Sequence, residues 1–520
     1  MIWHIVRKEL LVNLQSLRFL IGLVVSALMM GIVGYVLVQD YATRLQKYIA
    51  NVQEHRETLA QTKVYSMVAV VVDIPPSPLS VFSRGSQDLP TSVHVSPYHV
   101  PSLIDEGGGS ASISLWGTSS HPDNPLLRMF TSIDLGFVIS TILSLFAVML
   151  LFDSFSGERE QGTLKLILAA SAGRVHLLAG KFLGALVTLA IPLTVGFLEV
   201  MILWTLHPAL SFDASVWAGV GLVYLASLLF LSSFLALALL LSLYARESSS
   251  SLMYLLLAWV TVSVVIPAGG GYIAEYLRPR GLRENMLSEA DRASTEFMKA
   301  LDRIEYQQKS GWNNASTNPL GGESLLGITE EEANNRLAYN QKVVPMKFRF
   351  AGDRFLVVES YAQALRSWSQ LRDDLIRPSL CIGYGNIVKA IAGTDIESFD
   401  DMVQKARLYR EAMMAYLRPK SETTLWFTRV FEYPDVQPTE SNQKYWQSLI
   451  EKQGERAVEK ILSWDRMSSL DLTSMPAPSV SLRGAAERAA GALPDALVLL
   501  AGCLLFIALS IIRVRHYPLN

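Results

Sequence analysis

The stretch DSFSGEREQGTLKLILAASAGRVHLLAGKFLG, residues 153–184, places a dense group of charges between two long apolar runs. Within it, Gly157, Glu158, Arg159 and Glu160 are followed by Gly162, Thr163 and Leu164. A short amphipathic helix can follow them, and Gly173 with Arg174 can form a turn before the next apolar run. We call residues 153–181 the elbow segment and interpret it as the polar connection between two membrane-spanning helices.

Length and composition indicate a membrane protein. The chain has 520 residues, of which 50% are hydrophobic, and its mean hydropathy of +0.28 is too high for a typical soluble protein. The formal net charge of −2 offers no whole-chain reason to expect nucleic-acid binding, which needs a concentrated basic face. The chain has only two cysteines, Cys381 in a polar region and Cys503 in an apolar one, which excludes a disulfide framework.

Apolar runs of about 20 residues, the length that crosses a hydrocarbon core, recur along the chain. We therefore predict a mainly α-helical polytopic membrane protein. The six predicted spans are residues 19–38, 130–152, 182–206, 216–243, 248–274 and 494–512. Residues 1–18 separate apolar from mostly basic side chains and predict an amphipathic helix at the membrane surface. A cleaved signal peptide is the alternative there, but the helix is long and further spans follow it.

Two polar segments are predicted to form extracytoplasmic domains. Residues 39–129 contain a β-like run at 64–72, followed by several prolines and a glycine-rich loop at 105–110. Residues 275–488 are too long for a loop and place apolar residues at helical spacing, apart from a loop at 312–322. We therefore expect the second segment to be a large, mostly helical domain.

The distribution of charge predicts which side of the membrane each segment faces. The chain ends, the elbow segment and the turn between the fourth and fifth spans hold ten Lys and Arg residues against five acids. The rest of the chain holds 35 basic and 42 acidic residues. Because cytosolic loops are enriched in Lys and Arg, the elbow segment and both termini are predicted to be cytosolic.

The elbow segment resembles the coupling segment of type 2 ATP-binding-cassette (ABC) permeases, which have the type V exporter fold. The shared pattern is GERE-x-GT-L, a basic turn, and then L-x-x-GK-x-L-G, which here ends at Leu178, Gly180, Lys181, Leu183 and Gly184. The stretches PPSPLSVFSRG, residues 75–85, and residues 376–413 resemble external segments of a subgroup with large extracytoplasmic domains after the first and fifth spans.

The resemblance implies a permease subunit that couples ATP hydrolysis on a separate ABC ATPase dimer to export or to mechanical work outside the membrane. ATP and magnesium would bind the ATPase, and this chain would bind no cofactor. Further implied partners are a second copy or a related permease, membrane lipid and an extracytoplasmic partner, in a bacterial-type cytoplasmic membrane. Residues 157–160 and 162–164 would contact the ATPase, with Thr163 capping a helix at 164–168.

Two alternatives remain open for these features. On spacing alone, the elbow segment could be an ordinary charged loop, and the whole chain could be a non-transporting scaffold or sensor whose external domain binds a partner. Glu199 is an acid inside a predicted span and therefore a candidate for the transport pathway. Its alternative is a carboxylate that reaches water, because it lies within about a turn and a half of the outer surface.

The sequence offers no catalytic or metal-binding constellation. The spacing from Gly173 to Gly180 is too long for a phosphate-binding loop, and Phe182 stands where Ser or Thr is required. His94 and His99 lack the partners of a metal motif, and no Gly-x-Ser-x-Gly nucleophile turn is present. We therefore predict that the chain itself is not an enzyme.

Overall fold

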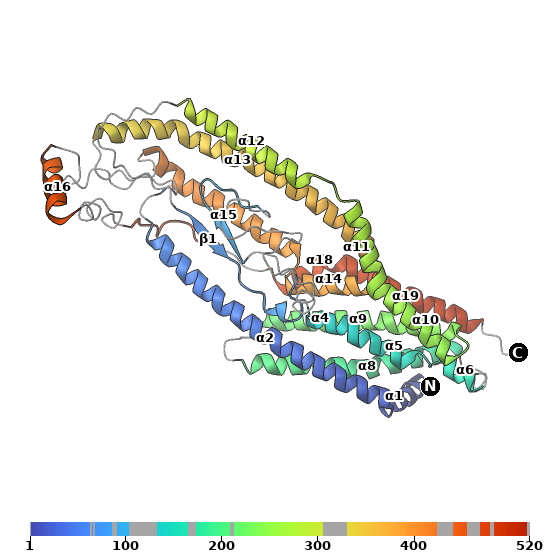
Figure 1. Cartoon of the computed structure of the whole chain (residues 1–520). Coiled ribbons are helices and arrows are strands. Elements are labelled where there is room, and N and C mark those ends of the chain that lie inside the picture. The colour runs from blue at the N-terminus through green and yellow to red at the C-terminus, as the bar shows by residue number, and fades with distance from the viewer. Residues whose placement is uncertain are drawn as a thin grey trace.

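The structure is a computed structural model that describes most of the chain. The described residues are 2–62, 65, 68–85, 91–102, 133–164, 173–207, 213–304, 330–423, 440–454, 469–478 and 483–516. The molecule is elongated, with α1 and the last turn of α19 at one end and long helices reaching away from the other (Figure 1).

Helices dominate the described residues. In chain order the elements are α1 (Ile2–Leu14), α2 (Leu17–Ala60), β1 (Val70–Asp73), η2 (Pro78–Val81), β2 (Ser92–Val95), α4 (Leu135–Val138), η3 (Ile139–Leu143), α5 (Ser144–Leu151), α6 (Ser156–Glu160), α8 (Arg174–Thr205), α9 (Ala214–Tyr244), α10 (Ser248–Val260), η4 (Thr261–Val265), α11 (Ile266–Tyr276), α12 (Leu282–Asp302), α13 (Glu330–Ile376), α14 (Leu380–Ala392), α15 (Ile396–Thr423), α16 (Glu440–Gln453), α18 (Ala485–Gly491) and α19 (Leu493–Arg515).

Six helical segments are long and apolar enough to cross a membrane, which confirms the predicted fold class. They are Leu17–Ala60, Leu135–Glu160, Arg174–Thr205, Ala214–Tyr244, Ser248–Tyr276 and Leu493–Arg515. The first of them continues well beyond the predicted span 19–38, because no glycine or proline follows that would end the helix before Ala60. Its start is capped by Ser16, whose hydroxyl accepts a hydrogen bond from the Phe19 N–H at 3.1 Å.

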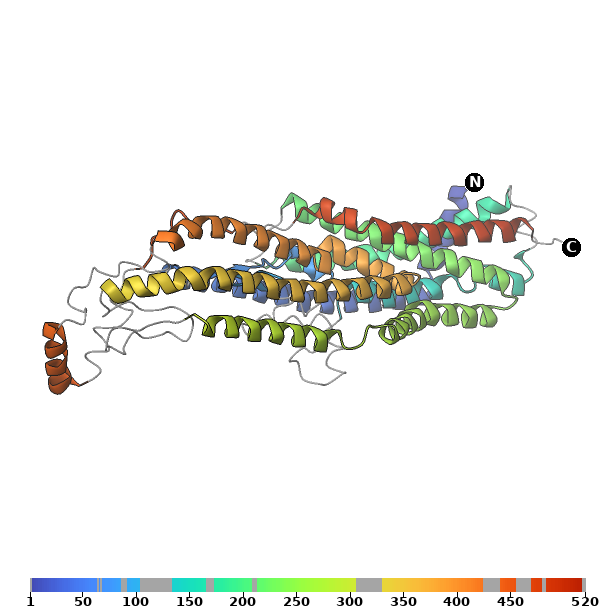
Figure 2. The same cartoon turned by 90° about the horizontal axis from the view of Figure 1, so that it is seen from above.

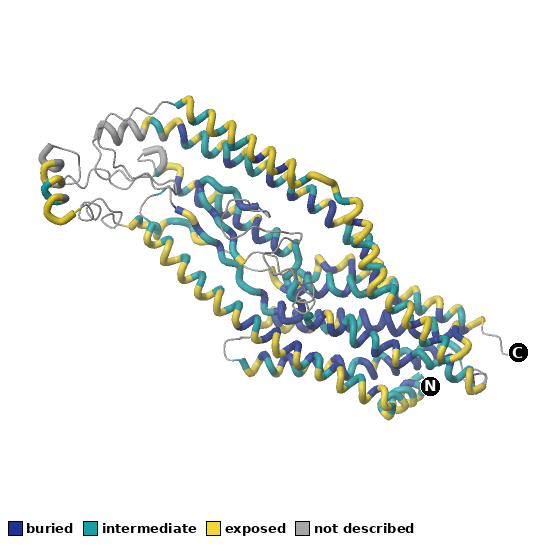
Figure 3. The backbone as a smooth tube through the Cα atoms, viewed as in Figure 1, coloured by how far each residue is buried: buried dark blue, intermediate teal, exposed yellow. Residues whose placement is uncertain are grey.

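Helix α9 forms the centre of the transmembrane bundle, by which we mean the six spans and the helices packed among them. It contacts α19, α14, α5 and α8, while α1 and α2 pack on the outer side of α8. Figure 3 shows α9 as a largely buried element, whereas few residues of α10 and α11 are buried. Exposed apolar residues on the outer helices are the expected surface for contact with lipid.

Helix α14 belongs to this bundle, although the sequence predicts residues 275–488 as one external domain. Tyr384 is fully buried, its ring stacks on Phe230 at 4.7 Å, and its hydroxyl hydrogen-bonds with that of Ser227 at 2.8 Å. Its neighbours Ile387 and Val388 lie in the same hydrophobic cluster as the spans. Sequence inspection misses this helix because 13 residues are too few to cross a membrane.

A second hydrophobic cluster joins the helices outside the bundle. Apolar residues from α12, α13 and α15 pack there with the two-stranded antiparallel sheet, in which Val70 pairs with Val95. Helices α12 and α13 run side by side in both views (Figures 1 and 2). Of the β-like run predicted at 64–72, only its last residues belong to strand β1. The predicted loops at 105–110 and 312–322 lie outside the described residues.

Candidate functional site

The elbow segment begins with a tight reversal at the end of the second span. Helix α6 lies at the same end of the molecule as α1 (Figure 1). It is closed by Gly162, whose φ of +73° is in the left-handed region and whose N–H donates to the Arg159 carbonyl at 3.0 Å. Glycine suits this position, because other residues adopt this conformation only with strain. The turn leaves Glu160, Gln161 and Gly162 exposed, and we call these three residues the elbow tip.

The Glu158 carboxylate turns inward to a buried lysine. Lys181 of α8 is 3% exposed and donates to Glu158 at 2.8 Å and to Glu9 of α1 at 3.1 Å. A buried ammonium needs such partners, since an unpaired charge away from water is strongly unfavourable. Two carboxylates around one ammonium leave one negative charge in excess, and Glu158 Oε2 has no hydrogen-bond partner among the described residues. The arrangement links α1, α6 and α8.

Arg159 binds the C-terminal end of one span, α9, and Glu160 binds the N-terminal end of the next span, α10. The Arg159 guanidinium donates to the Leu243 carbonyl at 3.0 Å and also to the Ala245 carbonyl, at the end of α9. The Glu160 carboxylate accepts from the Ser248 hydroxyl at 2.8 Å and from the Ser248 N–H at 3.3 Å, at the start of α10. Helix ends leave carbonyls and N–H groups without intrahelical partners, so a cation and an anion are the matching charges.

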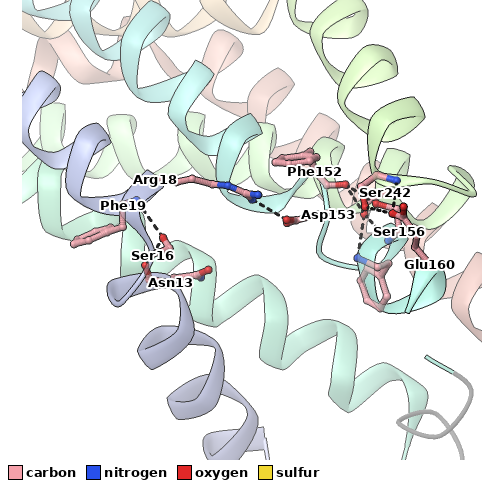
Figure 4. A network of polar contacts seen from close by, with 11 residues as sticks. Asn13, Ser16, Arg18, Phe19, Phe152, Asp153, Ser156, Glu160 and Ser242 are labelled. Atoms are coloured by element: carbon pink, nitrogen blue, oxygen red, sulfur yellow. Dashed lines mark hydrogen bonds and ion pairs between the residues drawn. The ribbon is translucent and has the colours of Figure 1, made fainter. Parts of the chain in front are cut away.

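Further contacts attach the beginning of the elbow segment to α2 and α9 (Figure 4). Asp153 accepts from Arg18, at the start of α2, at 2.7 Å, and the Arg18 guanidinium lies 4.7 Å from the centre of the Phe152 ring. The Ser242 hydroxyl of α9 accepts from the Phe155 N–H at 3.1 Å and donates to the Phe152 carbonyl at 3.1 Å. We call the whole set the elbow network: Glu9, Arg18, Asp153, Glu158, Arg159, Glu160, Lys181, Ser242 and Ser248.

The other predicted residues of the elbow segment contact only parts of the chain itself among the described residues. The Cβ position of Gly157 would lie 3.4 Å from Asp153 Cβ and 3.6 Å from Ser248 Oγ, so this glycine packs against both the start of the elbow segment and α10. Leu164 is buried. The Thr163 hydroxyl donates to the Glu158 carbonyl at 3.1 Å, while the helix that it was predicted to cap falls mostly outside the described residues. Their predicted contact with an ATPase therefore stays a prediction.

Sequence reasoning did not single out the partners of this network. Lys181 enters the sequence argument as part of the permease-like motif and of the cytosolic charge count, although a single charge next to a long apolar run is also a signal for a buried ion pair. Glu9 and Arg18 precede the first span and looked like ordinary surface charges. Ser242 and Ser248 carry no sequence signal, because only the fold brings them next to α6.

The opposite end of the bundle is held by a second set of contacts, which we call the outer junction, residues 75–85 with 392–394. The Ser77 hydroxyl donates to the Ala392 carbonyl at 2.5 Å, and the Thr394 hydroxyl donates to the Ser83 carbonyl at 3.2 Å. Both external stretches that resemble the permease subgroup therefore meet here. Next to them, Asp134 accepts hydrogen bonds from the Phe137 N–H at 2.7 Å and from the Ser83 hydroxyl at 2.9 Å.

A cavity of about 420 Å³ lies beside the outer junction, between α2 and the start of α15. Arg44 and Arg84 both pair with Asp40 at 2.8 Å on its wall. Lys47 and Tyr48 also line it and have no hydrogen-bond or ionic partner among the described residues. Its volume lies within the range of roughly 300–1,000 Å³ that is typical of small-molecule sites.

Glu199 lies in the outer half of α8 and faces α2. The Cβ position of Gly31 would be 3.3 Å from Glu199 Oε2, so the glycine leaves room for the carboxylate. This oxygen is shielded from solvent and has no hydrogen-bond partner among the described residues. A carboxylate in this position agrees with either a pathway role or a structural one. Within the described residues, no group of three or more potential ligands could hold a metal ion.

Comparisons with known proteins agree with this architecture. The model of the family "ABC-2 family transporter protein" matches residues 3–310, which is more than half of the chain. A "Probable ABC transporter permease protein NosY" from Pseudomonas aeruginosa is 38% identical over 112 residues, 21% of this chain and 40% of that protein. A protein of the same name from Stutzerimonas stutzeri is 33% identical over 136 residues, 25% of this chain and 49% of that protein. The chain thus spans less than half the length of either relative.

Proposed function

The chain belongs to the ABC-2 family of transporter proteins, and on this basis we propose that it is the transmembrane permease subunit of an ATP-driven exporter. Its ATPase would be a separate polypeptide that binds ATP and magnesium. The permease would couple ATP hydrolysis to cargo export or to mechanical work on the extracytoplasmic side. The curated relatives are named as permeases, which supports the same class.

The elbow network is the observation that carries this proposal. Side chains of the elbow segment bind α8, α9 and α10, and through Lys181 and Arg18 the segment also holds α1 and α2. The elbow tip, in contrast, is exposed. A push on the tip would therefore reach five helices at once, and this is the mechanical requirement for an element that an ATPase drives.

The proposed switch is a shift between two packings of these helices. Packed cores are bistable rather than continuously deformable, so small displacements at one end are converted into discrete rearrangements. ATP would close the ATPase dimer, displace α1 and the elbow tip together, and move the spans that the elbow network holds. The charge distribution supports placing this end in the cytosol.

The assembly would contain two permeases, because an ABC ATPase dimer offers two equivalent surfaces for an elbow. The second permease would be another copy of this chain or a related one. The exposed apolar residues of α2, α10 and α11 would face lipid or this second subunit. Outside the membrane, the outer junction and its cavity would receive the cargo or an extracytoplasmic partner.

Substitution of Gly162 tests the coupling directly. Its Cβ position faces open space, so Gly162→Trp adds a bulky ring to the elbow tip without an internal clash. The matched control is Gly162→Ala, which imposes the same left-handed strain without the bulk. In a complex reconstituted with the ATPase, we expect Gly162→Trp to lower stimulation of ATP hydrolysis at least tenfold and Gly162→Ala to lower it less than threefold.

Equal stimulation by wild type and Gly162→Trp would overturn the contact between tip and ATPase and would favour a non-transporting scaffold or sensor. Insertion and thermal stability of both variants are measured in the same preparation. Glu158→Lys is a second way to break the coupling. It places a second ammonium beside Lys181, and we expect it to disturb the elbow network as well as stimulation.

A further inference from the structure

An apolar groove opens on the transmembrane bundle near the elbow network. It has a volume of about 220 Å³ and lies between α8, α9 and α19. Its walls include Ala179, Leu183, Ala236, Ile507, Ser510 and Ile511. These residues come from the beginning of α8 and the ends of α9 and α19, so the groove belongs to the half of the bundle nearest to α1 and α6.

The groove is suited to hydrocarbon. Ser510 is the only polar side chain among its described walls, and its hydroxyl is satisfied by donating to the Phe506 carbonyl at 2.8 Å. Leu183 is 41% exposed, so the groove is open to the outside of the bundle, where a membrane protein meets lipid. The volume is below the roughly 300–1,000 Å³ of drug-sized sites, and it suits part of a single acyl chain.

Basic residues surround the mouth of the groove. Arg174 immediately precedes Val175 in the wall, and Arg515 follows Ile511 by one helical turn. The Arg174 guanidinium donates to the Arg515 carbonyl at 2.7 Å and to the Val514 carbonyl at 3.4 Å, which fixes the two helix ends side by side. Arg515 itself is exposed, and its side chain has no hydrogen-bond or ionic partner among the described residues.

No acid lies in the helix turns at the mouth of the groove, and the exposed Glu247 follows the end of α9 by three residues. The first turn of α8 and the last turns of α9 and α19 contain no Asp or Glu. The nearby carboxylates of α6 are already engaged, Glu158 by Lys181 and Glu160 by Ser248. A third arginine, Arg513, stacks its guanidinium 4.9 Å from the centre of the Tyr244 ring at the end of α9. The mouth of the groove is therefore positively charged, while its walls are apolar.

We propose that this groove binds one anionic phospholipid of the leaflet that faces the elbow network. One acyl chain lies between α8, α9 and α19, and the phosphate lies at the mouth, next to Arg174 and Arg515. A phospholipid matches both features at once. Its acyl chain and its phosphate lie at different depths along the membrane normal, as do the apolar groove and the arginines at its mouth. Bound there, the lipid holds α19 against the beginning of α8, the helix that also carries Lys181.

Native mass spectrometry of the purified full-length chain tests this site. Phosphatidylglycerol and phosphatidylcholine with identical acyl chains are titrated separately in mild detergent. We expect one phosphatidylglycerol to bind each chain about fivefold more tightly than phosphatidylcholine, since a Lys or Arg near an anionic surface contributes about 1 kcal/mol. The readout is lipid retention and does not depend on an ATPase, so its result is independent of the coupling test.

Two variants test the contributions of the head group and of the acyl chain separately. Arg515→Gln should abolish the preference for phosphatidylglycerol, and Ala179→Phe should lower retention of both lipids by filling the groove. The matched controls are Arg7→Gln, an exposed arginine on α1, and Val187→Phe, an exposed position of α8 outside the groove. Both controls should retain lipid as wild type does.

Three results would overturn the proposal. Equal retention of phosphatidylglycerol by wild type and Ala179→Phe would show that no lipid occupies the groove. If Ala179→Phe also lowered the fraction of dimer, a second copy of the chain would be the occupant instead. Equal affinity of wild type for the two lipids would show that the basic mouth does not recognise an anionic head group.

Discussion

The two ends of the transmembrane bundle are held together by different kinds of contact. At the elbow network, long charged side chains such as Arg159 and Lys181 reach across to other helices. At the outer junction, where Arg84 also pairs with Asp40 at 2.8 Å, short hydroxyls contact backbone carbonyls and backbone segments lie very close to one another. A Cβ atom at Gly85 would lie only 2.0 Å from the Thr394 carbonyl oxygen.

This difference indicates which end of the bundle can move. A flexible side chain can keep an ion pair while its helix shifts, because it has several rotatable bonds. Contacts between backbone segments at van der Waals distance cannot follow such a shift without a clash or a void. We therefore expect the helices to be displaced at the elbow network and to remain fixed at the outer junction.

Removal of the buried lysine should have the largest effect. Lys181→Met leaves the partly buried carboxylates of Glu9 and Glu158 next to each other without a cation. Removing one partner of a buried ion pair lowers the free energy of unfolding by roughly 3–5 kcal/mol. Thermal unfolding in detergent should show a clear loss of stability, together with lost stimulation of the ATPase.

The control for this variant is Lys8→Met, which removes an exposed lysine from α1 and should change stability by less than about 0.5 kcal/mol. Lys181→Met combined with Glu158→Gln should recover part of the loss, because only one carboxylate, that of Glu9, then remains in this partly buried site. If the double variant were no more stable than Lys181→Met alone, the ion pairs would not explain the effect.

A methyl group at the outer junction should have the next largest effect. Gly85 has a φ of +66°, and its added Cβ would overlap the Thr394 carbonyl, so Gly85→Ala combines backbone strain with a clash. Each contribution is about 1–3 kcal/mol. The matched control is Gly281→Ala, where φ is +72° and no atom lies within 4 Å of the Cβ position, so only strain applies.

Chemical denaturation of the two glycine variants measures the difference between them. Gly85→Ala should be the less stable one by at least about 1 kcal/mol, which is the smallest cost expected for overpacking. Equal stabilities would mean that the outer junction yields to a new methyl group. The contrast between a rigid outer end and a movable inner end would then be lost.

A conservative change in the elbow network should have the smallest effect. Arg159→Lys keeps the charge, but two different guanidinium nitrogens bind the Leu243 and Ala245 carbonyls, and the single ammonium nitrogen of lysine cannot occupy both positions. A hydrogen bond to a charged group contributes about 1.5–3 kcal/mol, and the lysine retains one of the two. We expect a loss near the lower value in thermal unfolding, with Arg7→Lys, on the exposed face of α1, unchanged.

Much of the architecture could be predicted from the sequence, because a membrane span is a local property. The six spans follow from apolar runs long enough to cross the hydrocarbon core, and the elbow segment follows from the charges that interrupt them. The position of α14 could not be predicted in this way. Its 13 residues are apolar but too short for a span, and only their packing against α9 and α19 places them in the bundle.

The partners of the elbow residues were equally hidden from sequence inspection. Glu158 and Lys181 are 23 positions apart, Arg159 and Leu243 are 84 apart, and Arg18 and Asp153 are 135 apart. No periodicity relates residues at such separations. A charged motif at the end of a span therefore predicted a functional segment without revealing that most of its charges bind other helices of the same chain.

The sequence by itself determined the helical spans, the charged elbow segment and the resemblance to a permease family, since each depends on residue type and spacing along one stretch. Only the tertiary structure decided that the elbow segment binds five helices, that α14 enters the bundle, and that basic helix ends adjoin an apolar groove. These features depend on residues brought together by packing, and side-chain packing between distant segments leaves no pattern in the chain itself.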